Sequence, residues 1–121
     1  MNKLIIIGNL TNDPELRTTT TGKNVCTFSV AVNRRSKQIN QPDADFFRVS
    51  AWNALGENCS RYLTKGRKVC VVGEVSLHTY ESNGKHGASL EVMAQDVEFL
   101  SPRTEIDPQS GMEKVNVDLP Y

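Results

Sequence analysis

Short stretches rich in β-branched residues follow one another along the first half of the chain, and most of them alternate between apolar and polar positions. The first covers residues 3–10, is interrupted at Asn12-Asp13-Pro14, and resumes over residues 15–18. Residues 25–33 and 45–52 alternate over their full length, which is typical of half-buried strands. Because Val, Ile and Thr together number 26, the composition also favours strands over helices.

The second half of the chain continues this pattern with two longer strands. One is predicted over residues 67–80 and another over residues 88–100. Asn83-Gly84 between them is a strong signal for a tight hairpin turn. Residues 20–24 and 34–43 are polar, and they predict a turn and a long hairpin loop between earlier strands.

The last predicted strand does not keep one alternation along its whole length. Val92 and Val97 both suit the core, yet they lie five positions apart and fall on opposite faces of a regular strand. One extra residue between them would restore both to the same face. The pattern therefore predicts a β-bulge near Gln95-Asp96.

Only one stretch predicts a helix. Leu55, Cys59, Tyr62 and Leu63 follow one another at the spacing of one helical face, and Gly66 stands where a helix commonly ends in glycine. The order is therefore three strands, a short helix and two strands. This order matches an all-β fold, the five-stranded Greek-key OB-fold barrel with one short helix between strands 3 and 4. A different small β-barrel has a similar order and stays open as an alternative.

The strand predicted over residues 45–52 has one apolar face and one face that carries two aromatic rings around an arginine. The apolar face holds Phe47, Val49 and Ala51, and the other holds Phe46, Arg48, Ser50 and Trp52. Because a protein core seldom carries Arg and Ser, the second face is expected to point out of the barrel. Phe46 and Trp52 are then exposed aromatics, unless a loop or a subunit interface covers them.

The strand predicted over residues 67–80 divides in the same way. Val69, Val71, Val75 and Leu77 share the parity expected to face the core, whereas Cys70, Glu74, Ser76, His78 and Tyr80 share the other. Tyr80 is therefore expected to join Phe46 and Trp52 on the outer face. Exposed rings of this kind stack on unpaired nucleobases without reading their sequence, whereas the bases of a duplex are hidden in its stack.

Charge is unevenly spread along the chain. The formal net charge is zero, yet residues 17–68 hold ten basic and three acidic side chains. Residues 69–101 hold one basic and five acidic ones. A basic segment with exposed aromatics favours a polyanionic partner, although surface Lys and Arg often have none. The candidates for contacts to phosphates are Lys3, Arg17, Lys23, Arg34, Arg35, Lys37, Arg48, Lys68, His78 and Lys85.

The length of 121 residues fits one domain, expected at residues 1–101, followed by a flexible tail at 102–121. The longest aliphatic run, residues 4–7, is far too short to span a bilayer, and the first residues do not suit a secretory signal. The cysteines are widely spaced and odd in number, which favours a reducing, cytoplasmic location over a disulfide framework or a metal site. They are Cys26, Cys59 and Cys70.

No cluster of groups suited to catalysis is recognisable in the sequence. His78 and His86 lie on opposite sides of a turn, and Cys26 and Cys59 lie on apolar faces without an evident His partner. An HxxxH motif, a paired-carboxylate motif and a glycine-rich phosphate loop are all absent from the sequence. We therefore expect no enzyme activity, no cofactor and no metal. An accessory OB-fold module that binds protein or RNA is the alternative to a stacking surface for unpaired DNA.

The chain opens with NKLIIIGNL and DPELR at residues 2–10 and 13–17, and continues with FFRV, YLTKG and VVGEV at residues 46–49, 62–66 and 71–75. In this order the motifs resemble those of the bacterial single-stranded DNA-binding proteins of the homotetrameric OB-fold type. The resemblance covers about residues 2–100. It implies sequence-independent binding and protection of single-stranded DNA during replication, recombination and repair, in association with the nucleoid. It also implies a homotetramer in which residues 3–10 pair across subunits.

The resemblance assigns roles to particular aromatic residues. The family's stacking rings correspond to Phe46, Trp52 and Tyr80, the same rings that the outward parity selects. A further family aromatic would fall near Ser36, where this chain has none. Arg34 and Arg35 lie beside that position, so the resemblance implies that this loop contacts DNA more through charge than through stacking.

The closing residues also resemble the family in part. Many members end in an acidic tip that closes with Pro-Phe and docks on replication and repair enzymes. The corresponding residues here are Asp118, Leu119, Pro120 and Tyr121. They form a degenerate acidic tip, with one acidic residue and Tyr in place of Phe, and an ordinary frayed terminus is the alternative.

Overall fold

A computed structural model describes residues 1–35, 39–40, 43–100, 104–106 and 113–115 of the chain. The elements are β1 Leu4–Leu10, β2 Glu15–Thr18, β3 Asn24–Asn33, β4 Ala44–Trp52, α1 Asn53–Tyr62, β5 Lys68–Ser82, β6 Lys85–Phe99, β7 Thr104–Ile106 and β8 Glu113–Val115. The predicted strands and helix are therefore present in the predicted order. β7 and β8, which the pattern did not predict, pair with each other in a separate two-stranded sheet.

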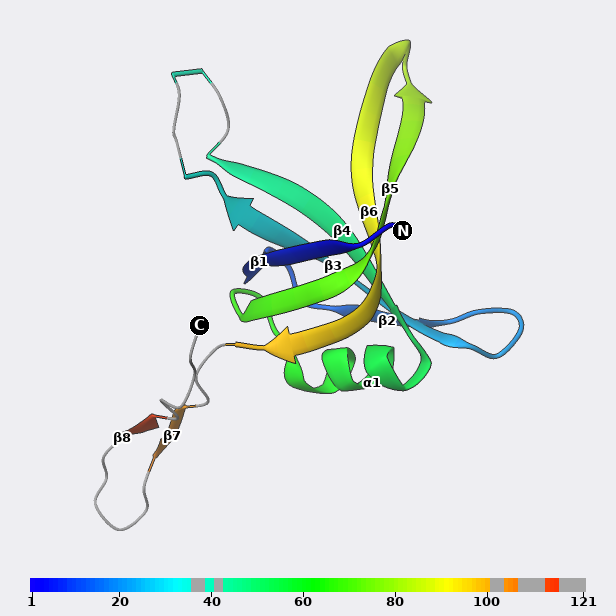
Figure 1. Cartoon of the computed structure of the whole chain (residues 1–121). Coiled ribbons are helices and arrows are strands. Elements are labelled where there is room, and N and C mark those ends of the chain that lie inside the picture. The colour runs from blue at the N-terminus through cyan, green and yellow to red at the C-terminus, as the bar shows by residue number, and fades with distance from the viewer. Residues whose placement is uncertain (36–38, 41–42, 101–103, 107–112, 116–121) are drawn as a thin grey trace.

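The six longer strands, β1 to β6, form one sheet that closes on itself (Figure 1). Its order is β1-β5-β6-β4-β3-β2, and β1 also pairs with β3 at Asn9↔Ala31 and Leu10↔Val30. β1 and β2 are the two parts of the first predicted strand, separated around Pro14. Neighbouring strands are antiparallel except β4 and β6, which are parallel. This irregular five-stranded ring with its helix is the OB-fold that the element order predicts.

The core lies inside the ring and against α1. Its buried residues include Ile6, Leu10, Cys26, Phe28, Val30, Val49, Ala51, Cys59, Leu63, Val69, Val71, Val92 and Val97. They confirm the inward parity predicted for residues 25–33 and 45–52. Leu77 is 65% exposed, so the prediction that it faces the core is wrong. The β5–β6 hairpin extends past the ring (Figure 1), and residues 76–82 at the end of β5 are all exposed, so the core does not reach this part of the strand.

The predicted β-bulge is present in β6. Val72 pairs with Asp96 and Gly73 pairs with Ala94, which leaves Gln95 without a partner on β5. The extra residue allows the strand to bury both Val92 and Val97. A Cβ atom on Gly73 would lie only 2.2 Å from the backbone oxygen of Met93, so the two strands approach closely at this point because of glycine.

α1 lies at one end of the ring, directly after β4 (Figure 1). Cys59 and Leu63 from its predicted apolar face are buried, and Leu55 packs against the core. Tyr62 is 51% exposed, and its ring centroid lies 6.2 Å from that of Phe99. No helix in the described part of the chain is long and apolar enough to cross a membrane.

The glycine after the helix has a different role from the predicted one. α1 ends at Tyr62 with Leu63 as its C-cap, so the prediction that Gly66 terminates the helix is wrong. Gly66 has φ +91° and belongs to the turn that leads into β5, where the Arg67 N–H donates to the Thr64 carbonyl oxygen at 3.1 Å. A left-handed backbone in such a turn favours glycine.

Two long hairpins leave the ring on the side away from α1 and diverge from each other (Figure 1). The β5–β6 hairpin turns at Asn83 and Gly84, both with positive φ, as the Asn-Gly pair predicts. Between β3 and β4, residues 34–35, 39–40 and 43 belong to neither strand, as the predicted loop requires, and the rest of the loop predicted at 34–43 lies outside the described residues. These hairpins carry much of the surface on which the predicted binding residues lie.

Candidate nucleic-acid interface

The ladder registers identify the side chains that share the outer face of the sheet. Arg48 of β4 pairs with Glu91 of β6, and Glu91 pairs with Ser76 of β5. Paired residues point to the same side, as do residues two apart on one strand. No bulge interrupts β5 or β6 between this row and the hairpin turn. The outer face therefore includes Phe46, Arg48 and Trp52 of β4 together with His78 and Tyr80 of β5.

The three aromatic rings on this face lie apart from one another. Phe46 is 60% exposed, Tyr80 is 51% exposed, and Trp52 is half-buried where β4 meets α1. Among the described residues, none of the three contacts another aromatic ring. They are separate surfaces spread over two strands, an arrangement that suits successive bases of an extended strand better than one compact ligand.

Tyr80 is supported by a glycine that the sequence pattern did not single out. It pairs with Gly87 across the β5–β6 ladder, and a Cβ atom on Gly87 would lie 2.4 Å from Cζ of the Tyr80 ring. The ring therefore lies against bare β6 backbone, with about half of the residue still open to a ligand. A glycine opposite an aromatic residue in a hairpin is the signal that would have identified this support.

The structure does not bring the predicted phosphate contacts into one patch. Arg48 and His78 lie on the outer face, and Lys23 lies beside Trp52 in the turn between β2 and β3. Arg35 and Lys85 lie near the outer ends of the two hairpins. Lys3 and Lys68 lie near opposite ends of the β1–β5 ladder, and Lys37 lies outside the described residues.

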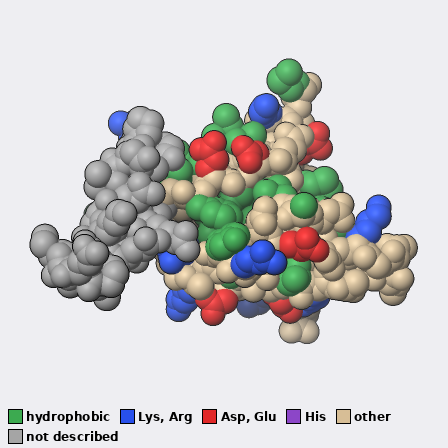
Figure 2. All heavy atoms as spheres, turned by 90° about the horizontal axis from the view of Figure 1, so that it is seen from below, with side chains coloured by type: hydrophobic (Ala, Val, Ile, Leu, Met, Phe, Trp, Pro, Cys, Tyr) green, Lys and Arg blue, Asp and Glu red, His purple; other side chains and the backbone are tan. Residues whose placement is uncertain are grey.

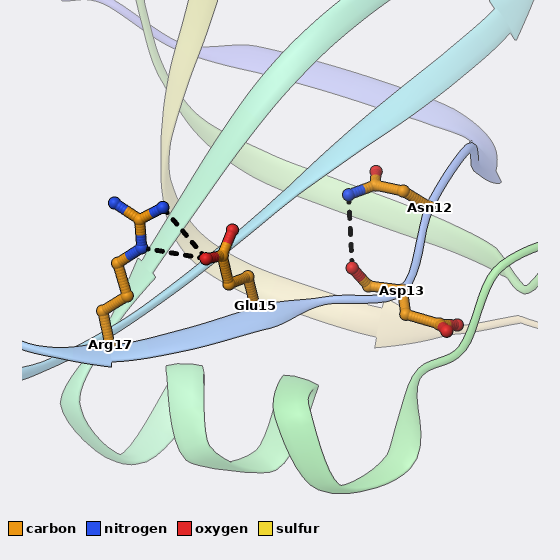
Figure 3. A network of polar contacts seen from close by, with 4 residues as sticks. All are labelled: Asn12, Asp13, Glu15 and Arg17. Atoms are coloured by element: carbon orange, nitrogen blue, oxygen red, sulfur yellow. Dashed lines mark hydrogen bonds and ion pairs between the residues drawn. The ribbon is translucent and has the colours of Figure 1, made fainter.

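Two of the predicted arginines are paired within the chain. The Nε and Nη2 atoms of Arg34 donate to Oδ1 of Asp45 at 3.1 and 2.7 Å, and this hydrogen-bonded carboxylate raises the pKa of the guanidinium. Arg17 Nη2 lies 2.9 Å from Glu15 Oε1 on β2 (Figure 3). A phosphate would have to compete with a carboxylate at both positions. Arg35, which is exposed, is the better placed cation of the β3–β4 loop.

Removing the loop arginines is expected to weaken the salt dependence of DNA binding. Each phosphate contact on a single strand contributes about 0.7 to the slope of log K against log salt. The double variant Arg34→Ala, Arg35→Ala should therefore lose about 0.7 from the slope if Arg35 alone contacts phosphate, and about 1.4 if both do. The relative affinity for oligo-dT and oligo-dC should change little, because phosphates carry no base identity.

Arg61→Ala is the matched control for this measurement, since Arg61 is exposed in the last turn of α1. It should leave the slope unchanged. Titrations at four or more salt concentrations determine each slope. An unchanged slope in the double variant would remove the β3–β4 loop from the interface.

The cysteines do not form a reactive site. Burial raises the pKa of Cys26 to about 11 and that of Cys59 to about 12. Desolvation also raises the pKa of half-buried Cys70, with smaller contributions from the Glu98 and Asp96 carboxylates. All three are thus protonated near neutral pH, which opposes a nucleophilic role. Among the described residues, no group of three His, Cys, Asp or Glu side chains could hold a metal ion.

These pKa shifts predict how the folded protein reacts with a thiol reagent. At about pH 8, iodoacetamide should modify Cys70 slowly and leave Cys26 and Cys59 unmodified, whereas all three should react in urea. Mass spectrometry of the labelled peptides measures each rate. Labelling of Cys26 in the native protein as fast as Cys70 would contradict its burial.

The same shifts give a sign for the pH dependence of stability. The folded pKa values of Cys26 and Cys59 exceed the ordinary value of 9.0. The two buried thiols therefore make their full contribution to the free energy of unfolding below about pH 9. This contribution is lost as the pH rises through the pKa values of the folded state.

Comparisons with known proteins agree with one another. The family model described as "Single-strand binding protein family" matches residues 1–100. Single-stranded DNA-binding protein 1 of Clostridium acetobutylicum is 39% identical over 108 residues, which are 87% of this chain and 98% of that protein. The single-stranded DNA-binding protein of Bacillus cereus is 41% identical over 113 residues, 92% of this chain but only 66% of that protein.

A solved structure gives the same picture of the fold. The crystal structure of the small single-stranded DNA-binding protein from Streptomyces coelicolor aligns with a TM-score of 0.70 at 27% sequence identity. The alignment covers 82% of this chain and 95% of that one. The structural similarity therefore includes most of the ring and is not confined to the sequence motifs near the N-terminus of the chain.

Proposed function

Because the chain belongs to the single-strand binding protein family, we propose that it binds single-stranded DNA without sequence preference and protects it during replication, recombination and repair. The observation that carries this proposal is the outer face of the sheet, where Phe46, Trp52 and Tyr80 share one side with Arg48. The family is non-catalytic, and the chain is not an enzyme. Because its proposed ligand is single-stranded DNA, we propose that the protein lies in the cytoplasm, in association with the nucleoid.

The geometry supports unpaired DNA over a duplex. Every base offers a flat face on which an exposed ring stacks, and each such stack contributes about 1–3 kcal/mol. Cations at Lys23, Arg35, Arg48 and Lys85 would meet the phosphates between stacked bases. In a duplex, both faces of each base are already stacked, so the aromatic rings would gain nothing.

The fluorescence of Trp52, the only tryptophan, tests this function directly. Oligo-dT should quench it in a saturable, salt-dependent way, and a duplex of equal length should not. Quenching by both nucleic acids alike would contradict stacking on unpaired bases. No response to either would favour the accessory OB-fold module that binds protein, and preferential quenching by oligo-rU would favour an RNA ligand.

We further propose that the protein is a homotetramer. β1 pairs with β5 from Leu4 to Asn9 but with β3 only at Asn9 and Leu10. Its other edge at residues 4–8 thus has no partner strand among the described residues, and such an edge favours pairing with another chain. Ile5 and Ile7 beside it are 61% and 44% exposed. Light scattering with and without long oligo-dT measures the mass, and a monomer in both samples would overturn this assembly.

The closing residues Asp118–Tyr121, which lie outside the described part, are proposed to dock on replication and repair enzymes. Leu119 and Tyr121 would enter an apolar pocket of the partner, and Asp118 would meet a basic rim. Deleting residues 117–121 should leave oligo-dT affinity nearly unchanged and abolish capture of a helicase or exonuclease that recognises acidic tips. Equal capture of the partner by the truncated and full-length chains in a pull-down would contradict docking and favour an ordinary frayed terminus.

A further inference from the structure

An apolar row crosses three strands on the inner side of the sheet and continues past the end of the core. Leu77 of β5 pairs with Leu90 of β6, and Leu90 pairs with Phe47 of β4. Phe47 in turn pairs with Val30 of β3, which belongs to the core. Because paired residues point to the same side of a sheet, Leu77, Leu90 and Phe47 form an apolar row that extends the core face outward.

The exposure of the apolar row increases with distance from the core. Phe47 is half-buried, Leu90 is 36% exposed and Leu77 is 65% exposed. Leu77 is the most exposed of the large apolar residues in strands β1 to β6. The next pair on the same side, Thr79 and Ala88, is exposed as well. Contiguous apolar surface that is open to water favours contact with a second apolar surface, unlike a scattered apolar residue.

The two sides of the β5–β6 hairpin differ in chemistry. The outer side carries His78 and Tyr80, the predicted contacts to DNA. Residues 75–92, all of which the structure describes, place only Glu81 and His86 as ionisable groups on the inner side, and these two pair with each other near the turn. The inner side of the hairpin therefore suits an apolar protein surface better than a polyanion.

The opposite side of the molecule provides a contrast. Figure 2 views the protein from the side of α1 and shows apolar side chains gathered in the middle of this side, with charges of both signs around them. Tyr62 of α1 and Phe99 of β6 are both exposed, but their rings contact each other. The apolar row instead ends at Leu77, on a hairpin that extends past the ring (Figure 1).

The apolar row is too small for a stable interface between free molecules. A stable protein interface buries about 800 Å² on each partner, far more than two leucines and their neighbours on one hairpin can provide. Neighbouring molecules on one DNA strand, however, are tethered to each other, which raises their effective concentration to about the millimolar range. A small apolar contact then suffices. The partner that a shared strand brings to this surface is a second copy of the same protein.

Resting on the proposed function, we propose that the apolar row joins neighbouring molecules of this protein on the same single strand. The inner sides of two β5–β6 hairpins pack face to face, with Leu77 and Leu90 of each copy against those of the other. The contact is self-complementary, because a two-fold axis relates the two rows. The hairpin extends past the ring on the side away from α1, so two hairpins can meet at a distance from their rings (Figure 1). The outer side of each hairpin stays available to DNA.

Binding to oligo-dT of two lengths tests this contact. The short strand holds one molecule or one closed assembly, and the long strand holds several side by side. Leu77→Ser should weaken binding to the long strand several-fold and leave binding to the short strand unchanged, because only the long strand brings two apolar rows together. Leu16→Ser is the matched control, since Leu16 is an exposed leucine of β2 outside the hairpin. It should bind both strands like the parent protein.

The outcomes separate this contact from the proposed function. An unchanged affinity of Leu77→Ser for the long strand would overturn the contact between copies and favour a different protein as the partner of the apolar row. Equal losses on the two strands would also overturn it, because Leu77 would then act on DNA binding itself. In either case, binding of the short strand by the parent protein shows that the proposed function survives. Failure of the parent protein to bind either strand would overturn that function and this contact with it.

Variants of opposite charge test the two-fold arrangement. Leu77→Glu and Leu77→Lys should each lower the ratio of the affinities for the long and the short strand, because like charges would face each other across the axis. An equimolar mixture of the two variants should raise this ratio toward that of the parent protein, since unlike charges then meet. A mixture that behaves like the average of the two separate variants would contradict the face-to-face contact at Leu77.

Discussion

Trp52→Ala, Phe46→Ala and Tyr80→Ala are each expected to weaken oligo-dT binding by about 1–3 kcal/mol, or roughly 5- to 150-fold, because each removes one surface on which a base stacks. Phe46 and Tyr80 are more than half exposed, so their loss should leave the fold intact. Titration by anisotropy of a labelled oligonucleotide measures the affinities without using the fluorescence of Trp52. If all three variants bind like the parent protein, the stacking surface is wrong.

Tyr62→Ala is a close control for Tyr80→Ala. Both tyrosines are 51% exposed, but Tyr62 belongs to α1 and contacts Phe99, whereas Tyr80 lies on the outer face of the sheet. Tyr62→Ala should leave oligo-dT affinity unchanged. A loss of affinity equal to that of Tyr80→Ala would show that any exposed ring contributes to binding. It would contradict the assignment of the interface to the outer face of the sheet.

Alternation predicted the faces of the strands well wherever the ring is closed. Cys26, Phe28 and Val30 are buried as predicted, and the parity change in β6 located the bulge at Gln95. Local sequence contains this information, because side chains alternate along a strand whatever its neighbours are. Leu77 lies on the predicted side of β5 and is still exposed, because alternation gives the side on which a residue lies but not how far the core extends.

The predicted cations were harder to place from the sequence. The ion pair between Arg34 and Asp45 depends on the register of β3 against β4, in which Asn33 pairs with Ala44. No local pattern gives that register, so Arg34 looked like an available cation. The apolar row on the inner side of the sheet was missed for the same reason, since β4, β5 and β6 meet only in the folded chain.

Phe28→Ala is expected to destabilise the fold by about 3–5 kcal/mol, since Phe28 is only 2% exposed and its removal leaves a cavity in the core. Parity alone predicts that Phe28 and Phe47 both face inward. Phe47, however, is half-buried at the edge of the core, so Phe47→Ala should cost only about 1–2 kcal/mol. Urea unfolding monitored by circular dichroism gives both values.

Measurements of oligo-dT binding distinguish a variant of the core from a variant of the interface. A small domain is stable by about 5–15 kcal/mol, so Phe28→Ala removes a large part of the free energy of unfolding. Any loss of oligo-dT affinity in that variant should follow the fraction unfolded and disappear on cooling toward the temperature of maximum stability. The loss in Trp52→Ala should remain under the same conditions, because a missing stacking surface cannot be restored by folding. Equal destabilisation by Phe28→Ala and Phe47→Ala would contradict the difference in burial between the two rings.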